Sequence, residues 1–446
     1  MKQQLSISNT IGLGFMLFAM FLGAGNMIFP PMVGFLSGTN LWPAAVGFLI
    51  TAVGLPLLGI IATAQVGGGF NDLARELPKS LIILAGSCVF LIIGPLYAVP
   101  RTALVSFEMG IQPFIGAKHH DSIQLIFSLV FFAITAYLCL RPGRLLDSIG
   151  KIITPALIIL LGILGLSPLF QPSRISGTPV DGIFSLSPLA GGFLEGYMTM
   201  DALAAIMFGI VMITNLRSHG IHEQKSQIHY CIITGFIAAL SLSLVYLSLL
   251  YLGASSTDLL PHSVNNGSQI LSFYVDHLYG FSGSILLSII VILACLTTAI
   301  GCITAACEYF DNLLPIRYSR LVFLCIITCV LLANLQLNRI IDLFIPVLQV
   351  LYPPCIVLIF LGLIRHYLIN PTLVYRSTLG VTLLISVSDT LYQSGYSPVA
   401  NTLSFLTLLP GSNVQMGWIL PAAASMALTV ITGLAKNHKQ ANDHSS

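Results

Sequence analysis

Long apolar runs alternate with short polar breaks along the whole chain. An α-helix crosses the hydrocarbon core of a bilayer in about 20 residues, and twelve runs have about that length. The expected spans lie near residues 10–36, 41–66, 80–104, 122–140, 150–170, 190–216, 228–254, 280–310, 320–337, 340–364, 374–393 and 414–435. The alternating pattern of a transmembrane β-barrel is absent from the sequence. The pattern therefore predicts an all-α polytopic membrane protein.

The composition supports that class. Only 8% of the 446 residues are charged and 56% are hydrophobic, whereas a soluble protein carries about 25% charged residues. The formal net charge is only +2 and no basic stripe is visible, which argues against a nucleic-acid partner. We expect one transmembrane domain, residues 1–446, surrounded by the lipid bilayer.

Basic residues indicate how the chain is oriented. If both termini and the even-numbered loops lie on one side, that side holds 14 of the 18 Lys and Arg residues. Basic loops favour the cytoplasm, so both termini are expected there. The first apolar run starts at Ile11 and continues without a small-residue cleavage site, which predicts a retained helix and not a removed signal peptide.

The first expected span contains residues that interrupt helices. Gly23-Ala24-Gly25-Asn26 is followed one turn later by Pro30-Pro31. Gly costs about 1 kcal/mol against Ala within a helix and Pro about 3 kcal/mol. Unwound backbone at membrane depth is tolerated only where it lines a cavity or is buried in protein. One interpretation is a broken helix that offers N–H groups to an anion and carbonyls to a cation. The other is close helix packing through Ala19 and Gly23.

The sixth expected span carries a carboxylate about midway along an apolar stretch. Asp201 follows Thr199 in a glycine-rich segment, and Phe208 lies two turns later. A carboxylate at that depth is costly and usually marks a substrate pathway, a proton site or an ion pair. Two alternatives stay open. Asp201 and Thr199 could cap the second half of a broken helix, or the span is misplaced and Asp201 lies at the interface.

Two further spans carry candidate chemistry. In the eighth span, the hydroxyls of Thr297 and Thr298 either bond back to their own helix or offer oxygens to a hard cation such as Na⁺, which needs several ligands at about 2.4 Å. In the third span, Arg101 is expected toward the outer end. It is interpreted either as a gate that pairs with Glu108 or Asp342, or as a snorkelling side chain.

The second interrupted span comes five spans after the first. Two interrupted helices at matching positions of two halves are a sequence indicator of an inverted-repeat transporter. We expect repeats at about 10–170 and 190–364, followed by two additional helices at about 374–435. The halves show no residue-level similarity, so this expectation rests on spacing.

Three long motifs carry a family resemblance. They are Gly23-Ala24-Gly25-Asn26-Met27-Ile28-Phe29-Pro30-Pro31, Gly94-Pro95-Leu96-Tyr97-Ala98-Val99-Pro100-Arg101-Thr102-Ala103 and Gly196-Tyr197-Met198-Thr199-Met200-Asp201-Ala202-Leu203-Ala204. They resemble the bacterial branched-chain amino acid:cation symporters, the system II or BrnQ-type carriers, over essentially the whole chain. That resemblance implies a LeuT-type fold, with a five-plus-five inverted repeat and helices 1 and 6 broken.

The resemblance also implies a site. In this fold the Gly-x-Gly of helix 1, here Gly23-Ala24-Gly25 with Asn26 after it, binds the substrate carboxylate through backbone N–H groups. A common sodium site maps onto the carbonyls of helix 1 and the hydroxyls of helix 8, here Ala19, Leu22, Ala294, Thr297 and Thr298. An outer arginine that some relatives carry in helix 1 is absent, and Phe29 lies near that place, so an outer gate would be built differently, with Arg101 as a candidate.

The expected function is Na⁺-coupled import of leucine, isoleucine and valine by alternating access, in a bacterial cell membrane and without an organic cofactor. The substrate ammonium would meet carbonyls of the sixth span, helped by Asp201, and Tyr97 and Phe208 are candidate walls for the aliphatic side chain. A proton-driven carrier that uses Asp201 is the near alternative. An intramembrane enzyme is the alternative from another class, and no His-Glu-x-x-His motif supports it.

Overall fold

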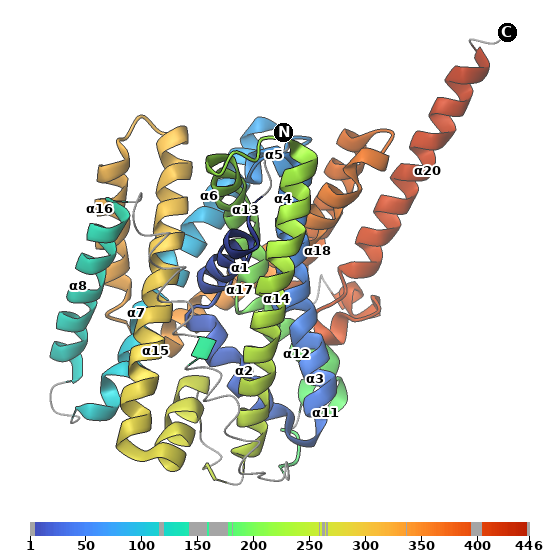
Figure 1. Cartoon of the computed structure of the whole chain (residues 1–446). Coiled ribbons are helices and arrows are strands. Elements are labelled where there is room, and N and C mark those ends of the chain that lie inside the picture. The colour runs from blue at the N-terminus through green and yellow to red at the C-terminus, as the bar shows by residue number, and fades with distance from the viewer. Residues whose placement is uncertain are drawn as a thin grey trace.

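Residues 5–115, 120–141, 158–159, 177–180, 182–257, 259–260, 264, 266–335, 337–393 and 404–443 are described by the computed structural model. Throughout this part of the chain the fold is built from helices, and most of them stand side by side in one bundle (Figure 1). The helices are α1 (Ile7–Phe21), α2 (Ala24–Ser37), α3 (Leu41–Leu49), α4 (Leu55–Val66), α5 (Phe70–Leu73), α6 (Lys79–Leu91), α7 (Ala98–Gly110), α8 (His120–Cys139), α11 (Ile183–Leu186), α12 (Pro188–Tyr197), α13 (Asp201–Ser218), α14 (Gln224–Ser255), α15 (Gly267–Leu313), α16 (Tyr318–Leu332), α17 (Leu337–Ile364), α18 (Pro371–Gln393) and α20 (Ile419–Asp443).

Both expected helix breaks are present. The first expected span consists of α1 and α2, which are separated at Leu22–Gly23, and the sixth consists of α12 and α13, which are separated at residues 198–200. The two prolines of the first span lie inside α2, so the glycines mark the break and the prolines do not. Met200 has a φ of 67°, a left-handed conformation that is strained for a residue with a side chain.

A third interruption was not expected. A π-helical segment, Ile92–Leu96, joins α6 to α7, and Gly94 within it has non-helical angles (φ −86°, ψ −117°). Pro95 follows and has no N–H to donate to the helix. A π-turn holds one extra residue, so it rotates every later side chain around the helix axis. The direction of Tyr97 and Arg101 is therefore set by this interruption.

Close helix packing holds the bundle together. Helix α12 packs against α3, α14 against α2, and α15 against α7. A side chain at Gly47 of α3 would collide with the Leu189 carbonyl, and one at Gly192 of α12 with the Ala44 carbonyl. Small residues of this kind let membrane helices approach closely. On the outside of the bundle, α8 exposes large apolar side chains such as Ile126 and Val130, as a lipid-facing surface requires.

The number of membrane spans differs from the expectation. In the described part of the chain, seven helical segments are long and apolar enough to cross a membrane, and three shorter apolar helices accompany them. The twelve spans are therefore not confirmed. One long segment, Ala24–Val66, unites the second half of the first expected span with the second span. The expected span at 150–170 lies outside the described residues, apart from Ile158 and Ile159.

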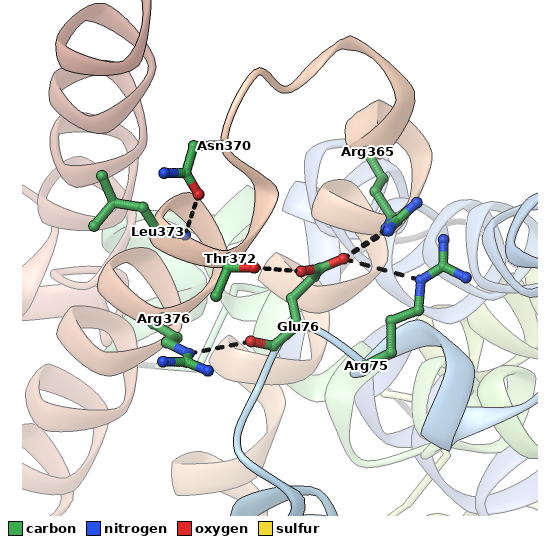
Figure 2. Close-up of polar contacts among 7 residues, drawn as sticks. All are labelled: Arg75, Glu76, Arg365, Asn370, Thr372, Leu373 and Arg376. Carbon is green, nitrogen blue, oxygen red and sulfur yellow. Dashed lines mark hydrogen bonds and ion pairs between the residues drawn. The ribbon is translucent and has the colours of Figure 1, made fainter. Parts of the chain in front are cut away.

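A polar cluster fastens α18 and the turn before it to the bundle, at the end where the chain termini lie (Figures 1 and 2). Glu76, between α5 and α6, accepts hydrogen bonds from Arg365 Nη2 and Thr372 Oγ1, each at 2.6 Å. Arg376 Nε donates to the Glu76 carbonyl at 3.2 Å. Partial burial by itself raises the pKa of Glu76. The bonds from Thr372 and Arg365 and the charges of Arg365 and Arg75 outweigh it, so the pKa lies below its usual value of 4.5.

We expect Glu76→Gln to lower the apparent melting temperature by about 1–3 °C at neutral pH. A depressed pKa contributes stability that is present above 4.5 and is lost as the pH falls through the folded value. The difference from wild type should therefore shrink below pH 4.5 in a thermal scan. Glu223→Gln, at an exposed position, is the control. A difference that is independent of pH would contradict this account of Glu76.

Candidate functional site

The two principal breaks meet around a small enclosed space, here called the central pocket. Its lining comes from the end of α1, both breaks, the start of α7, α13 and the middle of α15: Met20, Phe21, Gly23, Ala24, Gly25, Asn26, Ile93, Ala98, Arg101, Thr102, Thr199, Met200, Asp201, Ala204, Phe208, Thr298 and Cys302. The free volume is only about 30 Å³. Since a single water needs about 10–15 Å³, the pocket must widen to admit a larger ligand.

Asn26 joins the two breaks directly. Its Oδ1 accepts a hydrogen bond from the Gly23 backbone N–H at 3.1 Å, and its Nδ2 donates to Asp201 Oδ2 at 2.7 Å. Nδ2 also contacts the hydroxyl of Tyr246 on α14, and that hydroxyl donates to Asp201 Oδ2 at 2.6 Å. Asn26, Asp201 and Tyr246 are all buried. One amide therefore connects the loosened backbone of the first break to the carboxylate of the second.

The N-cap residue of α13 is Met200, which makes no side-chain capping hydrogen bond, so the Asp201 carboxylate does not cap this helix. The Thr199 hydroxyl donates to the Gly196 carbonyl at 2.8 Å and accepts a 3.5 Å contact from the Asp201 N–H. The Asp201 carboxylate is bonded instead by side chains of α2 and α14. With 2% exposure, Asp201 is buried among the helices of the bundle.

The hydroxyls of α15 face carbonyls of α1 and of the first break. Thr298 Oγ1 lies 3.1 Å from the Leu22 carbonyl and 3.4 Å from that of Met20. Thr297 Oγ1 lies 3.5 Å from the Ala19 carbonyl and donates to the Ala294 carbonyl at 2.8 Å. We call these six oxygens the hydroxyl–carbonyl cluster. Oxygen atoms are the ligands that hard cations prefer, so this set of hydroxyl and carbonyl oxygens suits an ion such as Na⁺.

Arg101 lies in the central pocket and not at the outer end of its span. Its Nη1 donates to the Tyr97 hydroxyl at 3.1 Å and to the Met198 carbonyl at 3.0 Å. Seven residues along α7, Glu108 accepts from Ser268 Oγ at 2.6 Å and from Asn266 Nδ2 at 3.4 Å. The outer-end placement of Arg101 is therefore wrong, because the apolar helical segment continues to Phe114 and does not end near residue 104. A gating role for Arg101 and Glu108 stays a prediction.

Most of the expected site residues come together. The central pocket includes Gly23, Ala24, Gly25, Asn26, Thr199, Asp201, Phe208 and Thr298. Tyr97 does not line it; its ring stacks on Phe344 at 5.0 Å and its hydroxyl holds Arg101. Two participants were missed, namely the Met20 carbonyl and Tyr246. Met20 lies between Ala19 and Leu22, whose carbonyls were predicted ligands, and this position was the available signal for it. Nothing in the local sequence distinguishes Tyr246 from other tyrosines.

Solved structures resemble this architecture over nearly the whole chain. The structure of MhsT in complex with L-phenylalanine aligns with a TM-score of 0.52 at 17% identity, covering 97% of this chain and 100% of that chain. Mhp1, a nucleobase-cation-symport-1 family transporter, aligns with a TM-score of 0.60 at 15% identity, covering 97% and 93%. These likenesses and the two broken helices define a helical membrane protein with the LeuT-type fold.

The sequence narrows that class to one family. A family model described as branched-chain amino acid transport protein matches residues 6–436. The branched-chain amino acid transport system 2 carrier protein of Pseudomonas aeruginosa is 43% identical, covering 94% of this chain and 95% of that protein. The permease BrnQ of Salmonella typhimurium is 40% identical, covering 97% of each. The chain belongs to the branched-chain amino acid transport protein family, whose members are transporters and not enzymes.

Gly25 offers a direct test of the pocket geometry. A Cβ at Gly25 would lie 2.5 Å from Arg101 Nη2 and 3.2 Å from the Thr199 Cα. We expect Gly25→Ala to reduce amino acid uptake by about tenfold or more, because an overpacked core costs about 1–3 kcal/mol. Gly12→Ala is the matched control, since a Cβ there meets nothing within 4 Å. Equal uptake by the two variants in proteoliposomes would contradict the geometry.

Proposed function

We propose that the protein imports leucine, isoleucine and valine together with Na⁺ by alternating access. The main support is the hydroxyl–carbonyl cluster, which lies directly beside the central pocket. Thr298 belongs to both, because it lines the pocket while its hydroxyl faces the Leu22 and Met20 carbonyls. An ion bound in the cluster would therefore stabilise the same segment of backbone that forms the pocket.

Sodium is the ion that this donor set fits. The cluster combines two side-chain hydroxyls with the carbonyls of Ala19, Met20, Leu22 and Ala294, and it contains no carboxylate. Neutral oxygens bind a hard monovalent cation without the charge that a divalent ion prefers. A further support is a structural relative described as a Na⁺-coupled sialic acid symporter, with a TM-score of 0.55 at 14% identity.

The central pocket has groups for each part of an amino acid. The first N–H groups of α2, at Ala24 and Gly25, have no partner within the helix and would meet the carboxylate. Carbonyls at the end of α12, with Asp201 nearby, would meet the ammonium. The aliphatic side chain would pack against Phe208, whose ring meets that of Phe21 at 5.4 Å. Since one methylene changes binding by only about 1–3 kcal/mol, all three branched side chains fit one pocket.

Alternating access would proceed by rearrangement of the half-helices. The repeats at about 10–170 and 190–364 would move against each other around the breaks, while the helices at about 374–435 stay fastened through Glu76. The pocket, with about 30 Å³ of free volume, would widen during this cycle. In the bacterial cell membrane, the loops that carry 14 of the 18 basic residues, together with both termini, would face the cytoplasm.

Thr298→Ala tests the proposed ion site. Removing one hydroxyl ligand should raise the Na⁺ concentration for half-maximal leucine uptake by roughly tenfold or more. Proteoliposomes with an imposed Na⁺ gradient give that value. Thr328→Ala, which removes a hydroxyl bonded only within α16, is the matched control and should behave as wild type. If uptake ignores the Na⁺ gradient and survives Thr298→Ala unchanged, the sodium site is wrong.

Asp201→Asn separates sodium coupling from the proton-coupled alternative. The buried carboxylate of Asp201 lines the pocket, which is the observation in favour of a proton site. If Na⁺ drives transport, the variant should have a lower affinity for leucine but keep the Na⁺ dependence of uptake. An imposed pH gradient should then drive leucine uptake neither by wild type nor by the variant. Uptake driven by a pH gradient in wild type and abolished in Asp201→Asn would favour the proton. Asp311→Asn, at an exposed position on α15, is the control.

A further inference from the structure

Arg101 is a buried cation with unused hydrogen-bonding capacity. Its side chain is 2% exposed and lines the central pocket. Nη1 makes two bonds, to the Tyr97 hydroxyl and the Met198 carbonyl. Nε is buried and has no hydrogen-bond partner. A guanidinium carries five N–H donors in a planar fork, so part of this fork remains available to a ligand in the pocket.

Arg101 also makes no direct ion pair within the described part of the chain. Among the described residues, no carboxylate oxygen lies within 4 Å of the Arg101 guanidinium, whereas the Arg365 guanidinium lies 2.6 Å from Glu76. The guanidinium carbon lies 4.8 Å from the ring centre of Tyr97 and 5.4 Å from that of Phe29. Such cation–π contacts offset part of the desolvation cost. A buried charge is otherwise costly unless an opposite charge and hydrogen bonds accompany it.

A second electropositive feature meets Arg101 at the same place. The guanidinium lies against Gly25, because a Cβ on that glycine would be 2.5 Å from Nη2. Gly25 is in the first turn of α2, a helix of 14 residues whose free N–H groups and dipole favour an anion. The planar fork of arginine matches the two oxygens of a carboxylate. Backbone donors and Arg101 thus converge on one anionic group.

We infer that Arg101 binds the carboxylate of the transported amino acid and makes a free carboxylate a requirement for binding. This inference rests on the proposed function, since it takes the substrate to be an amino acid. Tyr97 and the Met198 carbonyl position the guanidinium, and Gly25 leaves room for it. The substrate carboxylate forms the direct ion pair with Arg101 that Asp201, bonded to Asn26 and Tyr246, does not form. Leucine is then selected over its amide, which has the same side chain and ammonium group but no negative charge.

The test compares the affinity of the purified protein for L-leucine and L-leucinamide in the presence of Na⁺, by calorimetry at a pH where both amines are protonated. Wild type should prefer leucine by about 100-fold, because a buried charge pair loses that much when one partner is removed. Arg101→Met should reduce the preference to near unity by weakening leucine alone. Arg101→Lys should retain part of it, and Arg320→Met, at an exposed arginine, should retain all of it.

Each outcome has a distinct meaning. If Arg101→Met keeps the preference for leucine over leucinamide, the carboxylate is bound elsewhere and the inference fails. If Arg101→Met and Arg101→Lys each weaken the binding of leucine and of leucinamide by the same factor, Arg101 only stabilises the second break through its bond to the Met198 carbonyl. The inference then also fails. If wild type binds no leucine, the proposed function itself fails. Retained binding of leucinamide by Arg101→Met, together with lost discrimination, is the result that supports the inference.

Discussion

The structure depends on how the backbone groups released at the helix breaks are bonded inside an apolar bundle. Water is excluded there, so an unpaired N–H or carbonyl is costly. Asn26 bonds groups at both breaks, because its amide accepts a hydrogen bond from the Gly23 N–H and donates one to Asp201 of the other break. Tyr246 closes the arrangement from α14. The two interrupted helices are therefore coupled through one side chain, and a change at either break reaches the other.

The same breaks place opposite charges around one small space. Arg101 and Asp201 both line the central pocket, and each is held by other protein groups: Arg101 by Tyr97 and Met198, Asp201 by Asn26 and Tyr246. A free amino acid carries one positive and one negative group of its own. A pocket that keeps its cation and its carboxylate apart is complementary to such a zwitterion. The hydroxyl–carbonyl cluster lies next to the pocket, so an ion bound in the cluster and a ligand bound in the pocket would act on the same backbone.

The sequence was sufficient to predict both principal breaks and most of the pocket. Glycine destabilises a helix, and a carboxylate is costly at membrane depth. Both residue types can be read directly from the sequence, so their positions within apolar runs indicated the breaks. Tyr246 could not be predicted, since it lies 45 residues from Asp201 and resembles many other buried tyrosines. The direction of Arg101 could not be predicted either, because helical periodicity fails across the π-turn at Gly94. The dipeptide Gly94-Pro95 was the available signal for that interruption.

Coupling between ion and substrate is the central claim, and equilibrium binding tests it most directly. If Na⁺ binds the hydroxyl–carbonyl cluster and orders the backbone of the pocket, each ligand must strengthen the binding of the other by the same factor. The leucine dissociation constant, measured by calorimetry on the purified protein while Na⁺ replaces choline at constant ionic strength, should fall steeply as Na⁺ rises. A dissociation constant that does not change with Na⁺ would contradict the account.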